Sequence, residues 1–299
     1  MKILITGAGG QVGQALMRAC AAAELAHVGL THAQMDITDA QAVSDCLDRE
    51  TPDYVINAAA VSDVTAAQGD AAQCYAINRD GAALLAKACH ARGIALCYLS
   101  TDYVFSGQDA QTYTESDKPN PQNVYGNSKL EGENAVREYC PRHLIVRTSW
   151  LFSHEGNNFL TRVLTRAARG EAVRGVDDQF SCPTWTGHLA IICLAMLRQV
   201  HCNTEPALWG TYHYCDRGAT TRFDFARAIV KEGAQAGLMD QVPVEAINSA
   251  SLNNRAESAR ESVLNVDRIF YTFAIRQRGW RDGLKSAIAA SQEIESRVA

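Results

Sequence analysis

The 299-residue chain has no long hydrophobic run, although 47% of its residues are hydrophobic. None of its apolar segments approaches the roughly 20 residues that a helix needs to cross a bilayer. The first residues, Met1-Lys2-Ile3, lead directly into a strand-like segment, so we expect no signal peptide. These absences predict a cytoplasmic protein with no membrane partner.

The sequence also lacks a marked excess of charge of either sign. Its formal net charge is -5, and the charged residues are spread along the chain without long runs. A nucleic-acid surface or a membrane-binding face usually shows a cluster of basic residues, so neither partner is predicted. An anionic ligand would therefore need a site built from a few local residues.

Cysteine pairs of the C-x-x-C type are missing as well. The ten cysteines are scattered through the chain. Such spacing favours neither a disulfide framework nor a metal site, so we expect no metal ion. We interpret these cysteines as reduced, small apolar side chains that fill the core.

A glycine-rich turn is the first motif that the sequence does contain. Residues 2–6 have the composition of a short strand, and they are followed by Gly7, Gly10 and Gly13 in a G-x-x-G-x-x-G spacing. A helical pattern of apolar residues begins at Val12. A glycine turn between a strand and a helix allows a pyrophosphate to approach backbone N–H groups, so this order predicts a dinucleotide site.

Strand and helix patterns alternate from residue 2 to about residue 150. The predicted fold class is therefore α/β: a doubly wound parallel-sheet Rossmann fold with ligands at the carboxyl ends of the strands. Residues 1–150 would form the NAD(P)-binding domain, and residues 151–299 a smaller C-terminal substrate-binding lobe. A helix near 186–200 is expected to return to the first domain. Residues 70–92 are predicted as one long helix.

A tyrosine and a lysine stand four residues apart in the segment Tyr125-Gly126-Asn127-Ser128-Lys129. On a helix they share one face, and we expect the ammonium to lower the pKa of the phenol toward neutrality, as suits a general acid. Thr101, which follows an apolar run, could hold a carbonyl oxygen from the other side. The alternative is that this spacing occurs by chance on a surface helix.

The second strand, near residues 27–30, ends in Thr31-His32. An acidic residue at this place would bind the ribose 2′-hydroxyl of NAD, and the chain has none. His32 or Arg18 could bind a 2′-phosphate instead, or both could simply be solvated. The expected cofactor is NADPH, with NADH as the alternative.

These motifs together resemble an extended short-chain dehydrogenase/reductase and, within that superfamily, the dTDP-4-dehydrorhamnose reductase family. The resemblance covers essentially the whole chain and is carried by Gly10-Gln11-Val12-Gly13, Asn57-Ala58-Ala59-Ala60, Ser100-Thr101-Asp102-Tyr103-Val104-Phe105, Val124-Tyr125-Gly126, Arg147-Thr148-Ser149-Trp150, Gly156-Asn157-Asn158-Phe159, Asp178-Gln179, Pro183-Thr184 and Gly279-Trp280-Arg281-Asp282-Gly283-Leu284. It implies an NAD(P)H-dependent oxidoreductase of dTDP-rhamnose biosynthesis that reduces the 4-keto group of a nucleotide-activated 6-deoxyhexose.

The resemblance also implies roles for individual residues. The cofactor's pyrophosphate would be held by the glycine turn, at Gly7, Gly10, Gln11, Val12 and Gly13. Its adenine would be bordered by Asp36 and Ile37, in a turn after the second strand. Its nicotinamide ribose side would be lined by the small residues Ala58, Ala59 and Ala60. Tyr125 would be the acid, and Lys129 would both tune it and bind the nicotinamide ribose. Thr101 and Asp102 would contact the sugar, Trp150 would pack on the substrate, and Asn158 would meet its diphosphate.

The sequence departs from the family pattern in three places. Val64-Thr65-Ala66-Ala67-Gln68 lacks two usual carboxylates, Arg222 replaces a usual tryptophan, and the segment at residues 258–264, which begins Ser258-Ala259, lacks a usual arginine-proline pair. The sugar and the nucleotide base therefore stay open.

Two other functions remain alternatives, as does the oligomeric state. A sibling epimerase or dehydratase is one, although dehydratases carry a glutamate where Tyr103 stands. A non-catalytic regulatory subunit is the other, although Tyr125 and Lys129 are both present. The resemblance leaves a homodimer open.

Overall fold

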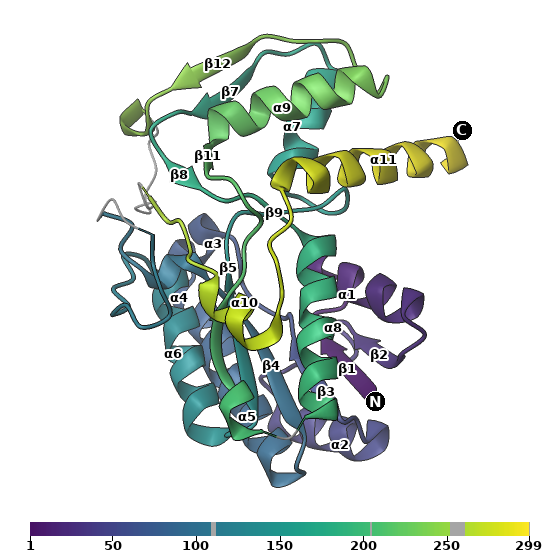
Figure 1. The fold of residues 1–299 in the computed structure, drawn as a ribbon, viewed down its shortest axis with the longest axis vertical. Coiled ribbons are helices and arrows are strands. Elements are labelled where there is room, and N and C mark those ends of the chain that lie inside the picture. Colours follow the sequence, from purple (N-terminus) through teal and green to yellow (C-terminus); the bar gives the residue numbers. More distant parts are fainter. Residues whose placement is uncertain (109–111, 204, 252–260, 299) are drawn as a thin grey trace.

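The computed structural model describes residues 1–108, 112–203, 205–251 and 261–298. A six-stranded sheet forms the larger lobe, and a smaller lobe lies above it in Figure 1. The strands follow the order β10 (Gly210–His213), β5 (His143–Thr148), β4 (Ala95–Thr101), β3 (Tyr54–Asn57), β1 (Lys2–Thr6) and β2 (Ala26–Leu30). All neighbouring pairs are parallel, which confirms the predicted Rossmann-type α/β sheet.

Helices cover both faces of this sheet because successive side chains of each strand point to opposite faces. Ile3 and Ile5 of β1 pack in one core with α1 (Gln11–Ala22), α8 (Thr186–Cys202) and α10 (Asp267–Phe273). Leu4 packs in a second core with α2 (Ala40–Glu50), α5 (Ala82–Ala91) and α6 (Val124–Tyr139). With both faces buried, the strands read as nearly continuous apolar runs.

A segment from the second half of the chain returns to the larger lobe. Helix α8 packs against α1, and β10 then pairs with β5 at the edge of the sheet. Helix α8 and strand β10 therefore both lie with the sheet, a longer return than the helix that the sequence predicts.

The smaller lobe has its own hydrophobic core, centred on Phe225 and Trp280. Three helices and several short strands surround it: α7 (Phe159–Ala168), α9 (Arg222–Gln235), α11 (Trp280–Val298), β6 (Leu151–Phe152), β7 (Val173–Val176), β8 (Phe180–Ser181), β9 (Thr184–Trp185), β11 (Thr220–Thr221) and β12 (Val244–Ile247). Figure 1 shows β7, β12 and α9 at the far end from the sheet.

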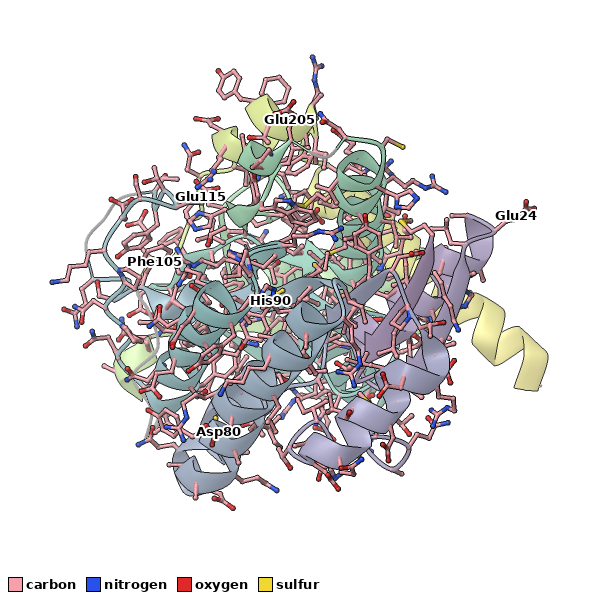
Figure 2. The ribbon with its side chains drawn as sticks, turned by 90° about the horizontal axis from the view of Figure 1, so that it is seen from below. Glu24, Asp80, His90, Phe105, Glu115 and Glu205 are labelled. Atoms are coloured by element: carbon pink, nitrogen blue, oxygen red, sulfur yellow. The ribbon has the colours of Figure 1, made fainter. Side chains whose placement is uncertain are left out.

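In the view from below (Figure 2), Glu24 in the turn after α1 points out into solvent. No helix in the described part of the chain combines the length and the apolar character that a membrane span requires.

The long helix predicted at residues 70–92 is wrong in its middle. It is divided into α4 (Ala71–Tyr75), a π-helical turn η1 (Ala76–Gly81) and α5. The turn is held by tertiary contacts that the sequence pattern does not contain. Asn78 accepts a hydrogen bond from the Val61 backbone N–H at 2.9 Å and donates one to the Ser128 hydroxyl of α6 at 3.0 Å. Such turns often occur beside functional sites.

Helix α6 approaches this π-helical turn very closely through Gly132. A Cβ atom added at Gly132 would lie 2.2 Å from the Asn78 carbonyl oxygen and 2.4 Å from the Tyr98 hydroxyl oxygen. Tyr98 donates a hydrogen bond to that same carbonyl at 2.9 Å. A glycine is therefore required where α6 crosses η1.

Replacing Gly132 by alanine should lower the free energy of unfolding by about 1–3 kcal/mol, because the methyl group overpacks a backbone contact. Urea titration monitored by circular dichroism measures this loss. Gly69→Ala is the matched control, since a Cβ at Gly69 meets nothing within 4 Å. Equal stability of the two variants would contradict the close approach.

Candidate active site

A cleft of about 380 Å³ lies between the carboxyl edge of the sheet and the smaller lobe. The residues that line it include Gln11 of the glycine motif, Thr101, Asp102 and Thr148 at strand ends, Tyr125 on α6, Trp150 and Asn158 before α7, and Arg222 at the start of α9. The structure thus brings together the predicted acid, the residues predicted to bind the substrate and one of the residues predicted to bind the pyrophosphate.

Tyr125 lies in the first turn of α6, whose start is fixed by the Asn123 side chain accepting a hydrogen bond from the Gly126 N–H at 2.8 Å. Burial raises the pKa of the Tyr125 phenol above its ordinary value, and a hydrogen bond with the Thr101 side chain offsets only part of this rise. The expectation of a lowered pKa is therefore wrong for this structure. The phenol stays protonated through neutral pH, as a proton donor must.

Lys129 lies one turn further along α6 with its side chain almost fully buried. Its ammonium nitrogen lies 4.0 Å from the centre of the Tyr98 ring. Among the described residues no hydrogen bond or ion pair holds this nitrogen. Burial lowers the pKa of Lys129 to about 7, and the charge of Glu133 opposes this change. The amine is thus a buried donor that needs a polar partner.

Glu133, two turns after Tyr125, anchors this face of α6 to the sheet. Its buried carboxylate accepts two hydrogen bonds from Arg147 of β5, at 2.9 and 2.7 Å, and one from Ser100 of β4 at 2.5 Å. Burial would raise the pKa of Glu133, but the hydrogen bonds and charge of Arg147 outweigh burial and hold the pKa below its ordinary value. The sequence analysis missed this residue, although the 125, 129, 133 spacing places it on the same face.

The glycine turn has the geometry that a dinucleotide needs. Gly7 has a positive φ of 66°, and a Cβ added there would lie 2.6 Å from the Ala59 backbone nitrogen. A Cβ at Gly13 would lie 2.2 Å from the Gly7 carbonyl oxygen. Helix α1 begins without a side-chain cap or an acidic residue in its first turn, so its N–H groups can receive an anion.

Polar atoms along the carboxyl edge of the sheet, from this turn to the end of β5, lack partners, which is a second sign that a polar ligand fits. Within the described residues, Gln11 Oε1, Asn57 Nδ2 and Thr148 Oγ1 are buried without a hydrogen bond. Buried polar groups are normally satisfied. Together with the Lys129 amine, these atoms suit the phosphates, ribose hydroxyls and carboxamide of a nicotinamide dinucleotide.

The residues expected near the adenine and nicotinamide are placed around the turn rather than in the 380 Å³ cleft. Asp36 accepts hydrogen bonds from the backbone N–H and the hydroxyl of Thr38, within its own turn. The Ile37 side chain is buried in the core, so only the backbone of Ile37 could border a ligand. Ala58 and Ala59 contact Gly7, whereas Ala60 is exposed.

Arg18 and His32 have different surroundings from those expected for a 2′-phosphate site. Arg18 forms an ion pair with Glu155 at 2.5 Å, and His32 is an exposed side chain 3.9 Å from Asp36. Thr31 lies against the glycine turn, because a Cβ at Gly9 would be 3.6 Å from its methyl carbon. Of these three side chains, Thr31 is the one that the structure places against the glycine turn.

The side chain of Asn158 already forms hydrogen bonds with nearby backbone groups. Its side-chain oxygen accepts hydrogen bonds from the Leu160 and Thr161 N–H groups, and its side-chain nitrogen donates to the Ser153 and Glu155 carbonyls. The oxygen thus caps α7, and the nitrogen holds the loop that precedes this helix. The departure at Ser258-Ala259 lies outside the described residues.

Comparison with known proteins gives consistent matches along the chain. The family model described as RmlD substrate binding domain matches residues 1–293. A dTDP-4-dehydrorhamnose reductase from Aggregatibacter actinomycetemcomitans is 33% identical, over 97% of this chain and 99% of that protein. A probable dTDP-4,6-dihydroxy-2-methyloxan-3-one 4-ketoreductase from Streptomyces antibioticus is 34% identical, over 96% of this chain and 94% of that protein.

A solved structure extends the likeness to the fold. The dTDP-4-dehydrorhamnose reductase from Bacillus anthracis, in complex with NADP, is 30% identical and superposes with a TM-score of 0.88, over 97% of this chain and 99% of that one.

Lys129→Met tests the burial of the amine through the pH dependence of stability. The pKa of Lys129 is about 7 in the folded protein and 10.5 without burial, so between these values the unfolded state binds more protons and stability rises with pH. The wild-type free energy of unfolding, minus that of the variant, should increase through this window by on the order of 1 kcal/mol per pH unit. Denaturant titrations of the cofactor-free proteins measure this difference, and a value independent of pH would contradict the prediction.

Proposed function

The chain belongs to the dTDP-4-dehydrorhamnose reductase family, and from this premise we propose that it reduces the 4-keto group of a nucleotide-activated 6-deoxyhexose with NADPH. The favoured reaction converts dTDP-4-dehydro-L-rhamnose to dTDP-L-rhamnose. The observation that carries the proposal is that Tyr125, Thr101 and Trp150 line one cleft together with Gln11 of the glycine motif.

Tyr125 would supply the proton in this reaction. Its protonated hydroxyl faces the cleft together with the Thr101 hydroxyl, so the two groups can hold one carbonyl oxygen between them once the Thr101 proton turns from Asp102 to that oxygen. NADPH, when bound, supplies the hydride to the carbonyl carbon. As the oxygen gains charge, proton transfer from the phenol completes the alcohol, and the nearby Lys129 amine stabilises the phenolate when it is protonated.

The residues that would hold the cofactor are those with unsatisfied polar atoms. The N–H groups at the start of α1 suit the pyrophosphate, and the Lys129 amine suits the hydroxyls of the nicotinamide ribose. Asn57 accepts hydrogen bonds from the Thr6 hydroxyl and the Ala59 N–H, which leaves its side-chain nitrogen free to donate.

Epimerase or dehydratase chemistry needs an additional proton-transferring group near the sugar. Asp102 is the carboxylate beside Thr101, and burial raises its pKa to about 6. It accepts a hydrogen bond from the Thr101 hydroxyl at 3.1 Å, which ties it to the proposed carbonyl-binding group. Tyr103 stands where dehydratases carry a glutamate, so reduction is favoured over dehydration.

The direct test is consumption of NADPH with dTDP-, GDP- and CDP-linked 4-keto-6-deoxy sugars. We expect turnover with the dTDP-linked sugar and a 6-deoxyhexose product. The 4-ketoreductase from Streptomyces antibioticus acts on a different dTDP-linked ketone by its name, so that class belongs in the panel. Activity without added NADPH, supported by tightly retained NAD, would favour an epimerase, and no activity with any sugar would favour a regulatory subunit.

Tyr125→Phe removes only the hydroxyl and keeps the ring that contacts Tyr103. Folding and NADPH binding should survive, while kcat falls by roughly 10²–10⁴, the usual cost of losing a positioned proton donor. Steady-state rates and fluorescence titration with NADPH measure both effects. Near-normal turnover would remove Tyr125 from the mechanism.

Thr31→Asp tests the cofactor preference. No carboxylate at this position opposes a 2′-phosphate, and no arginine is placed there to bind one, so we expect a modest preference of the wild type for NADPH. A new carboxylate should repel the 2′-phosphate and accept the 2′-hydroxyl, shifting kcat/KM toward NADH by on the order of 1–3 kcal/mol. An unchanged ratio of kcat/KM for NADPH and NADH would show that the ribose does not lie against Thr31.

A further inference from the structure

Arg222 is the first residue of α9, and its half-buried side chain lines the cleft. The guanidinium carbon lies 3.8 Å from the centre of the Trp150 ring and 4.8 Å from that of the Phe159 ring. In the part of the chain that the structure describes, no hydrogen bond or ion pair engages its N–H groups. Stacking of this kind fixes the plane of a guanidinium and leaves its edge available.

Without a ligand in the cleft, the surroundings of Arg222 are unfavourable for its positive charge. A helix N-terminus carries a partial positive charge, so a cation in the first turn of α9 is destabilising. Burial lowers the pKa of Arg222 to about 10, and the charge of Arg162 of α7, which lines the same cleft, adds to this effect. Arg222 nevertheless stays charged at neutral pH.

The nearest carboxylate does not neutralise the charge of Arg222. Asp102 interacts electrostatically with Arg222, but the two form no ion pair with each other. The cleft therefore carries excess positive charge at the side of the smaller lobe. An arginine in such surroundings is well suited to a ligand that brings two negative charges and several acceptor oxygens.

We propose that Arg222 is a specificity-determining residue that binds the diphosphate of the nucleotide sugar, an inference that rests on the proposed function. In a hexose the diphosphate is attached at C1, on the opposite side of the ring from C4. When C4 lies at Tyr125 and Thr101, the diphosphate leaves the sugar away from them, and Arg222 on the smaller lobe lines the rest of the cleft. Asn158 is already engaged in capping α7, so Arg222 takes the role that the family resemblance assigns to Asn158.

Arg222→Gln tests the proposal through the charge of the ligand. Calorimetric titration with dTDP, dTMP and thymidine should show that the wild type binds dTDP best and that the variant loses roughly 10- to 100-fold in dTDP affinity, as expected when a charge-assisted hydrogen bond is removed. Thymidine affinity should be unchanged. With the 4-keto sugar, KM should rise by a similar factor while kcat changes little, because Arg222 does not contact the reacting carbon.

Arg227→Gln is the matched control, since Arg227 is an exposed residue of the same helix that pairs with Asp224 instead of facing the cleft. Arg222→Lys keeps the charge without the planar donor pair and should recover part of the affinity. If Arg222→Gln unfolds, dTDP binding by Arg222→Lys still decides the question.

The outcomes separate this inference from the proposed function. Normal dTDP affinity and normal KM in a folded Arg222→Gln or Arg222→Lys variant would overturn the role of Arg222 even if the wild type reduces the sugar. Equal losses for dTDP and thymidine would also overturn it, since they would indicate a purely structural role. If the wild type binds dTDP through Arg222 but reduces none of the sugars, the proposed reaction fails while diphosphate binding stands.

Discussion

The geometry of the cleft depends on the hydrogen bonds that the buried carboxylate of Glu133 accepts. Arg147 and Ser100, from neighbouring strands, hold this carboxylate, so α6 cannot rotate or slide relative to the sheet. Tyr125 and Lys129 occupy the two preceding turns of the same face and inherit that fixed position. Removing one partner of such a buried pair leaves an uncompensated charge, which makes the arrangement strongly coupled. The reacting groups are thus positioned by an ion pair that does not itself line the cleft.

The sheet, the glycine turn and the Tyr125–Lys129 pair could be predicted because each depends on local sequence. Apolar runs mark buried parallel strands, and glycines mark a turn that needs positive φ or close backbone approach. The π-helical turn at Ala76–Gly81 could not be predicted, because Asn78 is held by Val61 and Ser128, which are distant in sequence. The helical propensity of residues 76–81 gives no sign that a π-helical turn interrupts the helix predicted at residues 70–92.

The pKa of Tyr125 shows a second limit of sequence reasoning. Spacing places a lysine beside the phenol, and charge alone predicts a lowered pKa. Burial acts on both groups in the opposite sense: it raises the pKa of Tyr125 and lowers that of Lys129 to about 7. Which effect prevails depends on the depth of the two side chains, and the depth is set by packing against Tyr98 and the sheet. A ligand that hydrogen-bonds the Lys129 amine would favour its charged form and restore the expected influence on Tyr125.

In the proposed function, the larger lobe supplies the proton and the smaller lobe binds the diphosphate of the substrate. Tyr125, Lys129 and Thr101 belong to the larger lobe and rest on its ion pair and two cores. Arg222 and Phe159 begin helices α9 and α7, which are fixed by a separate core around Phe225 and Trp280. A substitution at the start of α9 can therefore alter the charge of the cleft without moving the proton donor. The residue that we propose to bind the diphosphate is thus separate from those that hold the proposed proton donor in place, so the two proposed roles can change independently.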